Sequence, residues 1–173
     1  KPFRIPSGSM LPTLAIGERV LVNRVGTHFR DPQAGDILVF HPPASADAES
    51  GPQCAKEPAP ASACSTPGTT QADVNFIKRV VGVPGDRIAV RNGHVIRNGK
   101  LQKEPFISRT CDGGRGNACN LRNAITVPAG HYFMMGDNRG ESDDSRFWGP
   151  IPKSWIIGGA FATYWPPRRI GTL

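Results

Sequence analysis

NFIKRVVGVPGDRIAVRNGHVIRNGKL, residues 75–101, carries the pattern that decides the fold. Runs rich in Val and Ile alternate with turn residues: Pro-Gly-Asp follows the first run, and Asn-Gly pairs interrupt the second at 92–93 and 98–99. Asn-Gly between β-rich runs is the strongest short-range signal for a β-hairpin. The stretch therefore predicts a strand over 75–83, a turn, and hairpin strands over 87–101.

The rest of the chain shows the same character, with almost no helical periodicity. Apolar runs bounded by Gly or Pro predict strands at 18–25 and 36–41, two short strands within 124–138, and a final buried strand at 155–165. The final run is too short to span a bilayer. Residues 42–74 are rich in Pro, Ala and Ser and predict a long exposed loop.

We therefore expect one mostly-β domain over residues 1–173. Its core is split into about 1–90 and 124–173, with the long loop 42–74 inside the first part and a small β insertion at about 91–123. The high content of 20 Gly and 17 Pro agrees with many strands and turns.

The net charge is +7, from 21 basic and 14 acidic residues. The basic residues are scattered, and no signature of a nucleic-acid-binding module occurs, so we expect no nucleic-acid partner. A solvated basic surface or contact with anionic membrane headgroups explains the charge. The chain begins at Lys1 without an initiator Met or a spanning apolar run, which fits a mature secreted protein or a catalytic domain whose anchor lies upstream.

The four cysteines form two close pairs in loop-like sequence. Neither pair has the Cys-x2-4-Cys spacing of a structural zinc site, and no His lies near enough in sequence to complete one. The sequence therefore favours two local disulfides over zinc, Cys54–Cys64 and Cys111–Cys119, and we expect no metal and no cofactor. Disulfides indicate an oxidising compartment.

RIPSGSMLPTL, residues 4–14, is either a turn or the site of a reactive serine. A serine is a poor nucleophile unless a base removes its proton. A Ser-His-Asp enzyme is possible, but no motif links any of the four histidines to Ser9, and the Gly-x-Ser-x-Gly elbow is absent. Lys78 is the other candidate for the base. Alternation along a strand places it on one face with Phe76 and Val80, and burial among such apolar side chains lowers the pKa of a lysine. An edge-strand lysine that reaches water is the structural alternative.

GDNRGESDDSRFWG, residues 136–149, is the third notable stretch. Its polar side chains between glycines fit a solvated loop, a cation loop, or a buried hydrogen-bonding network that positions other groups. The EF-hand pattern does not match, because its glycine and terminal Glu are out of place.

Together, RIPSGSMLPTL, FIKRVVGVPGD and GDNRGESDDSRFWG closely resemble the sequence boxes of bacterial type I signal peptidases. The three occur in the right order, and the resemblance covers most of residues 3–41, 75–90 and 125–165. It implies a mostly β, barrel- or sheet-like catalytic core with a small β insertion and long loops.

The resemblance also implies a role for each matching residue. Ser9 is the nucleophile, Lys78 the general base, and Ser7 forms the oxyanion hole with the Ser9 N–H. The supporting network consists of Ser142, which hydrogen-bonds the lysine, the bracing pair Asp144 and Arg146, and the packing residues Gly136, Asp137 and Asn138. The shallow pockets for small side chains are lined by Ile5, Pro6, Met10, Leu14, Phe76 and Ile77.

By this resemblance the chain is a leader-peptide endopeptidase that cuts exported pre-proteins after an Ala-x-Ala-like site. We expect a monomer at the extracytoplasmic face of the bacterial cytoplasmic membrane, in contact with anionic lipid, with its N-terminal transmembrane anchor absent from this chain. Two alternatives stay open: a related Ser–Lys processing protease of pilin, conjugation or organelle type, and a non-catalytic secreted β-domain that binds anionic surfaces.

Overall fold

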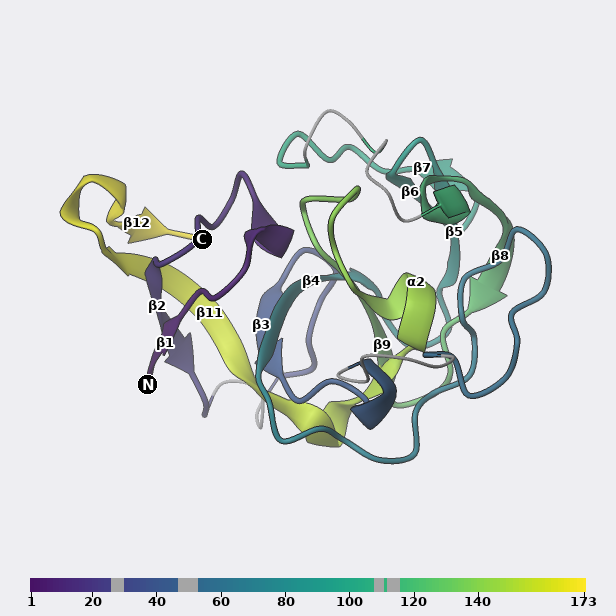
Figure 1. Cartoon of the computed structure of the whole chain (residues 1–173), viewed down its shortest axis with the longest axis horizontal. Helices are drawn as coiled ribbons and strands as arrows, with labels where there is room; N and C mark the ends of the chain where they lie inside the picture. Colours follow the sequence, from purple (N-terminus) through teal and green to yellow (C-terminus); the bar gives the residue numbers. More distant parts are fainter. Residues whose placement is uncertain (26–29, 47–52, 108–110, 112–115) are drawn as a thin grey trace.

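The computed structural model describes residues 1–25, 30–46, 53–107, 111 and 116–173, and its strands form two sheets (Figure 1). The larger sheet has eight strands, in the order β1-β2-β11-β3-β4-β9-β10 with β12 beside β11, and every strand pair is antiparallel. Its strands are β1 (Pro2–Arg4), β2 (Arg19–Asn23), β3 (Ile37–Phe40), β4 (Phe76–Gly82), β9 (His131–Met135), β10 (Ile151–Pro152), β11 (Ile156–Trp165) and β12 (Gly171–Thr172).

The smaller sheet has four strands in the order β7-β6-β5-β8. They are β5 (Arg87–Arg91), β6 (His94–Arg97), β7 (Lys100–Leu101) and β8 (Leu121–Thr126). This sheet extends beyond the 91–123 segment at both ends, because β5 follows the Pro-Gly-Asp turn directly and pairs with β8.

Helical structure is short throughout the described residues. The α-helix α2 (Ser145–Trp148) lies within the 136–149 box. The 3-10 turns are η1 (Gly8–Met10), η2 (Ala44–Ala46), η3 (Gly116–Cys119), η4 (Lys153–Trp155) and η5 (Pro167–Arg169). The expectation of a mostly-β fold is confirmed. None of the described helices is long and apolar enough to cross a membrane.

Both predicted Asn-Gly turns are confirmed. Asn92 and Asn98 have φ of 50° and 53°, and the glycine after each has φ of 79°. Positive φ at both central residues is what a type I′ hairpin turn requires, and Asn followed by Gly tolerates it best. The turns join β5 to β6 and β6 to β7.

The larger sheet is covered on both faces at β3, one of its inner strands. All four β3 residues are buried, so this strand is apolar throughout instead of alternating. One face packs around Ile37, Val39 and Ile77, and the other around Leu38 and Phe40. A third cluster joins the smaller sheet to β4 and β9 through Val81, Phe133 and Met135.

The prediction of a fully buried final strand is wrong for β11. Phe161 and Trp165 are 49% and 50% exposed. The strand runs past β3 and continues along β2 and the short β12, so this end lies at the margin of the molecule (Figure 1).

The described part of the 42–74 loop packs against the rest of the protein. Cys64 N donates to Arg146 O of α2 at 3.0 Å, and Asn123 Nδ2 of β8 donates to Pro60 O at 2.8 Å. The structure contains the predicted disulfides, Cys54–Cys64 and Cys111–Cys119.

Candidate active site

Ser9 lies in the 3-10 turn η1, between β1 and β2, and is buried. Leu11, the residue after η1, closes this turn, because its backbone N donates to Gly8 O at 3.0 Å. Asn138 fixes the turn from outside: its backbone N donates to Ser9 O at 3.0 Å, and its Nδ2 donates to Gly8 O at 3.2 Å. The backbone on both sides of the Ser9 amide is therefore held in place by one residue of the 136–149 box.

Lys78 lies in the middle of β4, on the sheet face that also carries Phe76 and Val80. The alternation argument is thus confirmed, and the edge-strand alternative is wrong, because β4 pairs with both β3 and β9 and Lys78 is 4% exposed. Its Nζ donates to Ser9 Oγ at 2.8 Å, although the residues are 69 apart in sequence. The Nζ also lies 5.1 Å from the centre of the Phe76 ring.

Ser7 is exposed and lies beside Ser9. Its Oγ donates to Ser9 Oγ at 3.4 Å, from an extended backbone with φ −135° and ψ 164°. The first serine of the Ser-Gly-Ser motif therefore reaches the same space as the second.

Asp137 connects β4, the strand of Lys78, with residues 11–18, the segment that follows Ser9 and is called the serine loop below. Arg79, next to Lys78, binds this carboxylate with two hydrogen bonds of 2.9 and 2.7 Å. Thr13 Oγ1 donates to the same carboxylate at 2.5 Å. Asp137 is fully buried, so one carboxylate links the residue after Lys78 with the segment after Ser9.

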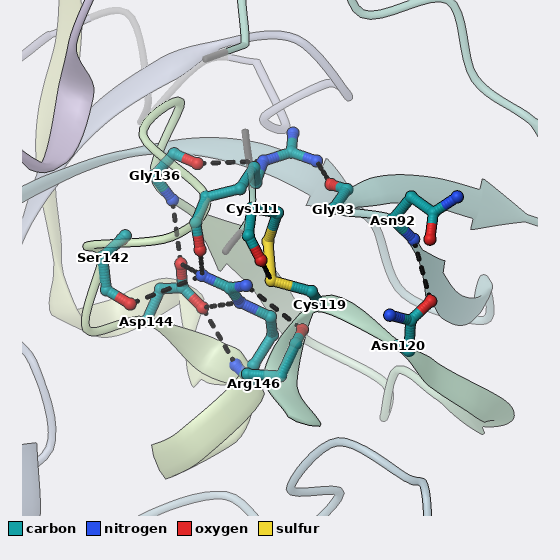
Figure 2. Close-up of a disulfide and its surroundings, with 11 residues drawn as sticks. Asn92, Gly93, Cys111, Cys119, Asn120, Gly136, Ser142, Asp144 and Arg146 are labelled. Atoms are coloured by element: carbon teal, nitrogen blue, oxygen red, sulfur yellow. Dashed lines mark hydrogen bonds and ion pairs between the residues drawn. A yellow bond between two sulfur atoms is a disulfide. The ribbon is translucent and has the colours of Figure 1, made fainter. Parts of the chain in front are cut away.

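Asp144 and Arg146 form a buried pair at the start of α2 (Figure 2). Arg146 donates to both carboxylate oxygens at 2.8 and 3.0 Å, and Gly136 N donates to Oδ2 at 3.1 Å. Burial alone would raise the pKa of Asp144, but the charge and hydrogen bonds of Arg146, with the Gly136 N–H, outweigh it and lower that pKa.

Ser142 is fully buried, and Figure 2 shows it beside Gly136 and Asp144. A Cβ on Gly136 would lie 2.2 Å from Ser142 Oγ and 2.4 Å from Ser9 O, so these two serines approach each other across this glycine. The Ser142 hydroxyl contributes to the lowered pKa of Asp144, yet it meets hydrogen-bond geometry with none of the described residues.

Comparison with known proteins identifies the family of this chain. The sequence model of the family described as "Signal peptidase, peptidase S26" matches residues 1–165. The chain belongs to this signal peptidase family. It is 37% identical to a signal peptidase I of Leptolyngbya laminosa over 98% of this chain and 70% of that protein. It is 39% identical to a probable signal peptidase I-1 of Synechocystis, covering 100% and 75% of the two chains.

A chloroplast member of the signal peptidase family is similar as well. The probable thylakoidal processing peptidase 2 of Arabidopsis thaliana is 36% identical over 100% of this chain and 40% of its own length. Family membership excludes the non-catalytic β-domain as an interpretation of the chain.

The histidines of this signal peptidase lie away from the Ser–Lys pair. His41 Nδ1 contacts Val74 O, His131 Nδ1 contacts Ala129 O, and His94 faces Glu104. His28 lies outside the described residues. None of the three described histidines is hydrogen-bonded to Ser9.

The structure does not bring the six predicted pocket residues together in one place. Ile5, Met10, Leu14 and Ile77 share one buried cluster. Pro6 is exposed, and Phe76 is partly buried in the cluster on the opposite face.

Sequence reasoning missed a second buried ion pair. Arg139 is 1% exposed, donates to Gly136 O at 2.9 Å, and forms two hydrogen bonds with Glu104 at 3.1 and 2.7 Å. It also donates to Gly93 O in the β5–β6 turn. The available signal was an arginine inside the box, but its partner lies 35 residues away, in sequence with no motif.

The Cys111–Cys119 disulfide adjoins this network (Figure 2). Gly93 N donates to Cys119 O at 2.9 Å, and Arg146 Nη1 donates to Ala118 O at 3.2 Å. The small sheet and the disulfide loop are thereby connected to the box that holds Ser142.

Proposed function

We propose that this protein removes leader peptides from exported pre-proteins, cutting after an Ala-x-Ala-like site, with Ser9 as nucleophile and Lys78 as general base. The observation that carries the assignment is the buried contact of 2.8 Å between Lys78 Nζ and Ser9 Oγ. Membership of the signal peptidase family gives the reaction class. The contact supports the choice of these two residues among all serines and lysines of the chain.

In the first half-reaction, Ser9 Oγ attacks the carbonyl carbon of the scissile peptide bond. The neutral Lys78 amine takes the hydroxyl proton as the O–C bond forms. The carbonyl oxygen becomes an oxyanion, which accepts hydrogen bonds from the Ser9 N–H and the Ser7 hydroxyl. When the C–N bond breaks, Lys78 returns the proton to the departing amine, which is the new N-terminus of the mature protein.

In the second half-reaction, water replaces the amine. Lys78 takes a proton from the water as its oxygen attacks the acyl carbon, and a second oxyanion forms. Collapse of that intermediate breaks the bond to Ser9 Oγ, and Lys78 returns the proton to the serine. A lysine can act this way only when neutral, and the burial of Lys78, which is 4% exposed, disfavours the charged form.

The supporting residues have distinct roles in this proposal. Asn138 sets the position of the Ser9 backbone, and Asp137 joins Arg79 to the serine loop through Thr13. Ser142, next to the buried Asp144–Arg146 pair, packs against Gly136 and supports the serine turn through this glycine. The hydrogen bond from Ser142 to the lysine that the resemblance implies does not form, because its hydroxyl has no hydrogen-bond partner among the described residues. The cluster of Ile5, Met10, Leu14 and Ile77 restricts the pockets to small side chains on one face of the sheet, and Phe76 lies on the opposite face.

We also propose that the protein works at the extracytoplasmic face of a bacterial membrane, on anionic lipid. Exposed apolar side chains gather where β11 and η5 adjoin the serine loop: Ile16, Phe161, Trp165 and Ile170. Basic side chains lie among them, since Arg19 pairs in register with both Trp165 and Arg4.

The test is cleavage of a pre-protein with an Ala-x-Ala leader by Ser9→Ala and Lys78→Ala variants. We expect each to lose activity by roughly 10⁴-fold or more, with an unchanged circular dichroism spectrum. The matched controls are Ser154→Ala, at an exposed serine, and Lys100→Ala, at an exposed lysine, and both should cleave normally. Full activity of Lys78→Ala would refute the mechanism.

Substrate and pH supply two further readouts. A leader with a bulky residue in place of the Ala at −1 should be a poor substrate. Cleavage should increase into the alkaline range as Lys78 loses its proton. A profile set only by a group that titrates near pH 6.5 would indicate a histidine instead.

A further inference from the structure

Arg169 reaches the segment that follows Ser9. It lies in η5 (Pro167–Arg169), 156 residues from Thr13 in sequence. Its Nη2 donates to Pro12 O at 3.3 Å and to Thr13 O at 3.1 Å. One guanidinium therefore holds two consecutive carbonyls, three and four residues after Ser9.

The same guanidinium neutralises a buried carboxylate. Glu18, at the end of this segment, is 2% exposed, and Arg169 Nε forms an ion pair with its Oε1. The Glu18 oxygens have no other partner among the described residues. A carboxylate this deeply buried needs a paired charge, so Arg169 is tied to this place by more than the two carbonyls.

Residues 8–18, which begin at the serine turn, are thus held at both ends. At the end toward the box, Asn138 binds the backbone of Gly8 and Ser9. At the other end, Arg169 binds the carbonyls of Pro12 and Thr13 and closes on Glu18. Between them the chain is compact, because Leu14 N donates to Met10 O at 2.9 Å and both side chains are buried.

We propose that Arg169 is a positioning residue for catalysis, which keeps Ser9 Oγ within hydrogen-bond distance of Lys78 Nζ by clamping the segment 12–18. The proposal rests on the function proposed above. Arg169 lies outside residues 1–165, the part that the family model matches. A guanidinium suits the task, because its rigid planar fork presents five N–H donors in fixed directions toward a carboxylate and carbonyls at the same time.

The effect on the rate follows from geometry. A displacement of about 1 Å at the reacting atom costs roughly 100-fold in rate. The described hydrogen bonds and ion pairs of Arg169 go to Pro12, Thr13 and Glu18, and none goes to Lys78 or to the 136–149 box, so its loss should act on the rate through the position of Ser9.

The experiment compares Arg169→Ala, Arg169→Lys and Arg168→Ala in cleavage of the same pre-protein. Arg168 is the matched control, because it is an adjacent, exposed arginine with no hydrogen bond or ion pair to another described residue. We expect Arg169→Ala to lower kcat by roughly 10- to 100-fold with KM within about twofold of wild type. A small acylating inhibitor should modify Ser9 more slowly by the same factor, and Arg168→Ala should match wild type in all three measurements.

Arg169→Lys keeps the charge beside Glu18, so this variant tests the clamp even if Arg169→Ala does not fold. We expect it to fold and to have a kcat below that of wild type and above that of Ser9→Ala. A wild-type kcat in either folded Arg169 variant would overturn the proposal. Ser9→Ala, assayed in parallel, separates the two hypotheses: if it still cleaves, the proposed function itself fails, whatever Arg169 does.

Discussion

Gly136 occupies a position in which the absence of a side chain determines the geometry of the site. A Cβ there would lie 2.2 Å from Ser142 Oγ and 2.4 Å from the backbone oxygen of Ser9. The second contact is with backbone, so the serine turn itself would have to move. We predict that Gly136→Ala lowers the cleavage rate by about 100-fold, because Ser9 shifts relative to Lys78.

Gly159→Ala is the control for this substitution. Gly159 lies in β11 of the larger sheet, and a Cβ there would meet only Leu38 Cδ2, at an ordinary 3.9 Å. Its cleavage rate should stay within about twofold of wild type. Equal rates for the two variants in steady-state kinetics would show that the close packing around Gly136 has no bearing on catalysis.

Asp144 gives the protein a predictable response to acid. Its pKa is lowered in the folded state, since the effects of Arg146 and Gly136 outweigh that of burial. A lowered folded pKa contributes stability above the unfolded value of about 3.9, and this stability is lost as pH falls through the folded pKa. The wild-type free energy of unfolding should therefore decrease on acidification below about pH 4.

Asp144→Asn should change both the size and the pH dependence of stability. At neutral pH it leaves the Arg146 guanidinium buried without its carboxylate, which costs about 3–5 kcal/mol. Below pH 4 it should lose less further stability than wild type does, because one linked proton is absent. Urea unfolding from pH 3 to 8 measures both, and parallel pH curves for the two proteins would contradict the assignment.

At the scale of elements, α2 is held between two segments that are each closed by a disulfide. Cys64 N donates to the backbone oxygen of Arg146, and the Arg146 side chain donates to Ala118 O, next to Cys119. We predict that replacing either cysteine pair by serine lowers the free energy of unfolding by about 2–3 kcal/mol, the value for short closed loops.

Reductant provides the control for the cysteine variants. Adding it to wild type should lower the urea midpoint at least as far as removing one disulfide, whereas a protein lacking both pairs should not respond to it. An unchanged midpoint in both double-serine variants would mean that the non-covalent contacts alone hold these segments on α2.

Local chemistry explains which elements were predictable from sequence. The Asn-Gly turns need positive φ at both central residues, and few other dipeptides tolerate that, so the sequence specifies the hairpins. The period of two in β4 likewise places Lys78 with Phe76 and Val80. The burial of β11 was not predictable, because its apolar run says nothing of what covers it, and Phe161 and Trp165 are half exposed.

The site was predictable to the extent that motifs carry it. Ser9 and Lys78 lie in recognisable boxes, and the structure joins them. Arg139 with Glu104, and Arg169 with Glu18, are pairs in which at least one member has no motif. Their meeting depends on the packing of the small sheet and of η5 against the core, which the fold determines and single-sequence patterns do not.

For the molecule as a whole, exposed apolar residues are unevenly placed. Figure 1 shows β12 and the C-terminal part of β11 at one end of the molecule and the small sheet at the other. Phe161 and Trp165 belong to the first end, with Ile16 after the serine turn and Ile170 directly after η5, while Leu101 of β7 is a 52% exposed side chain on the small sheet. If the first end contacts lipid, binding must depend on its side chains and not on Leu101.

We predict that the protein binds vesicles containing anionic lipid more strongly than neutral ones, and that added salt weakens this binding. Phe161→Ser with Trp165→Ser removes two half-exposed side chains, worth roughly 2 kcal/mol together, so the partition coefficient should fall about 30-fold. Leu101→Ser is the matched control and should bind as wild type does. Co-sedimentation measures all three proteins, and an equal loss in the Leu101 variant would show that lipid is not bound through the end that carries β11.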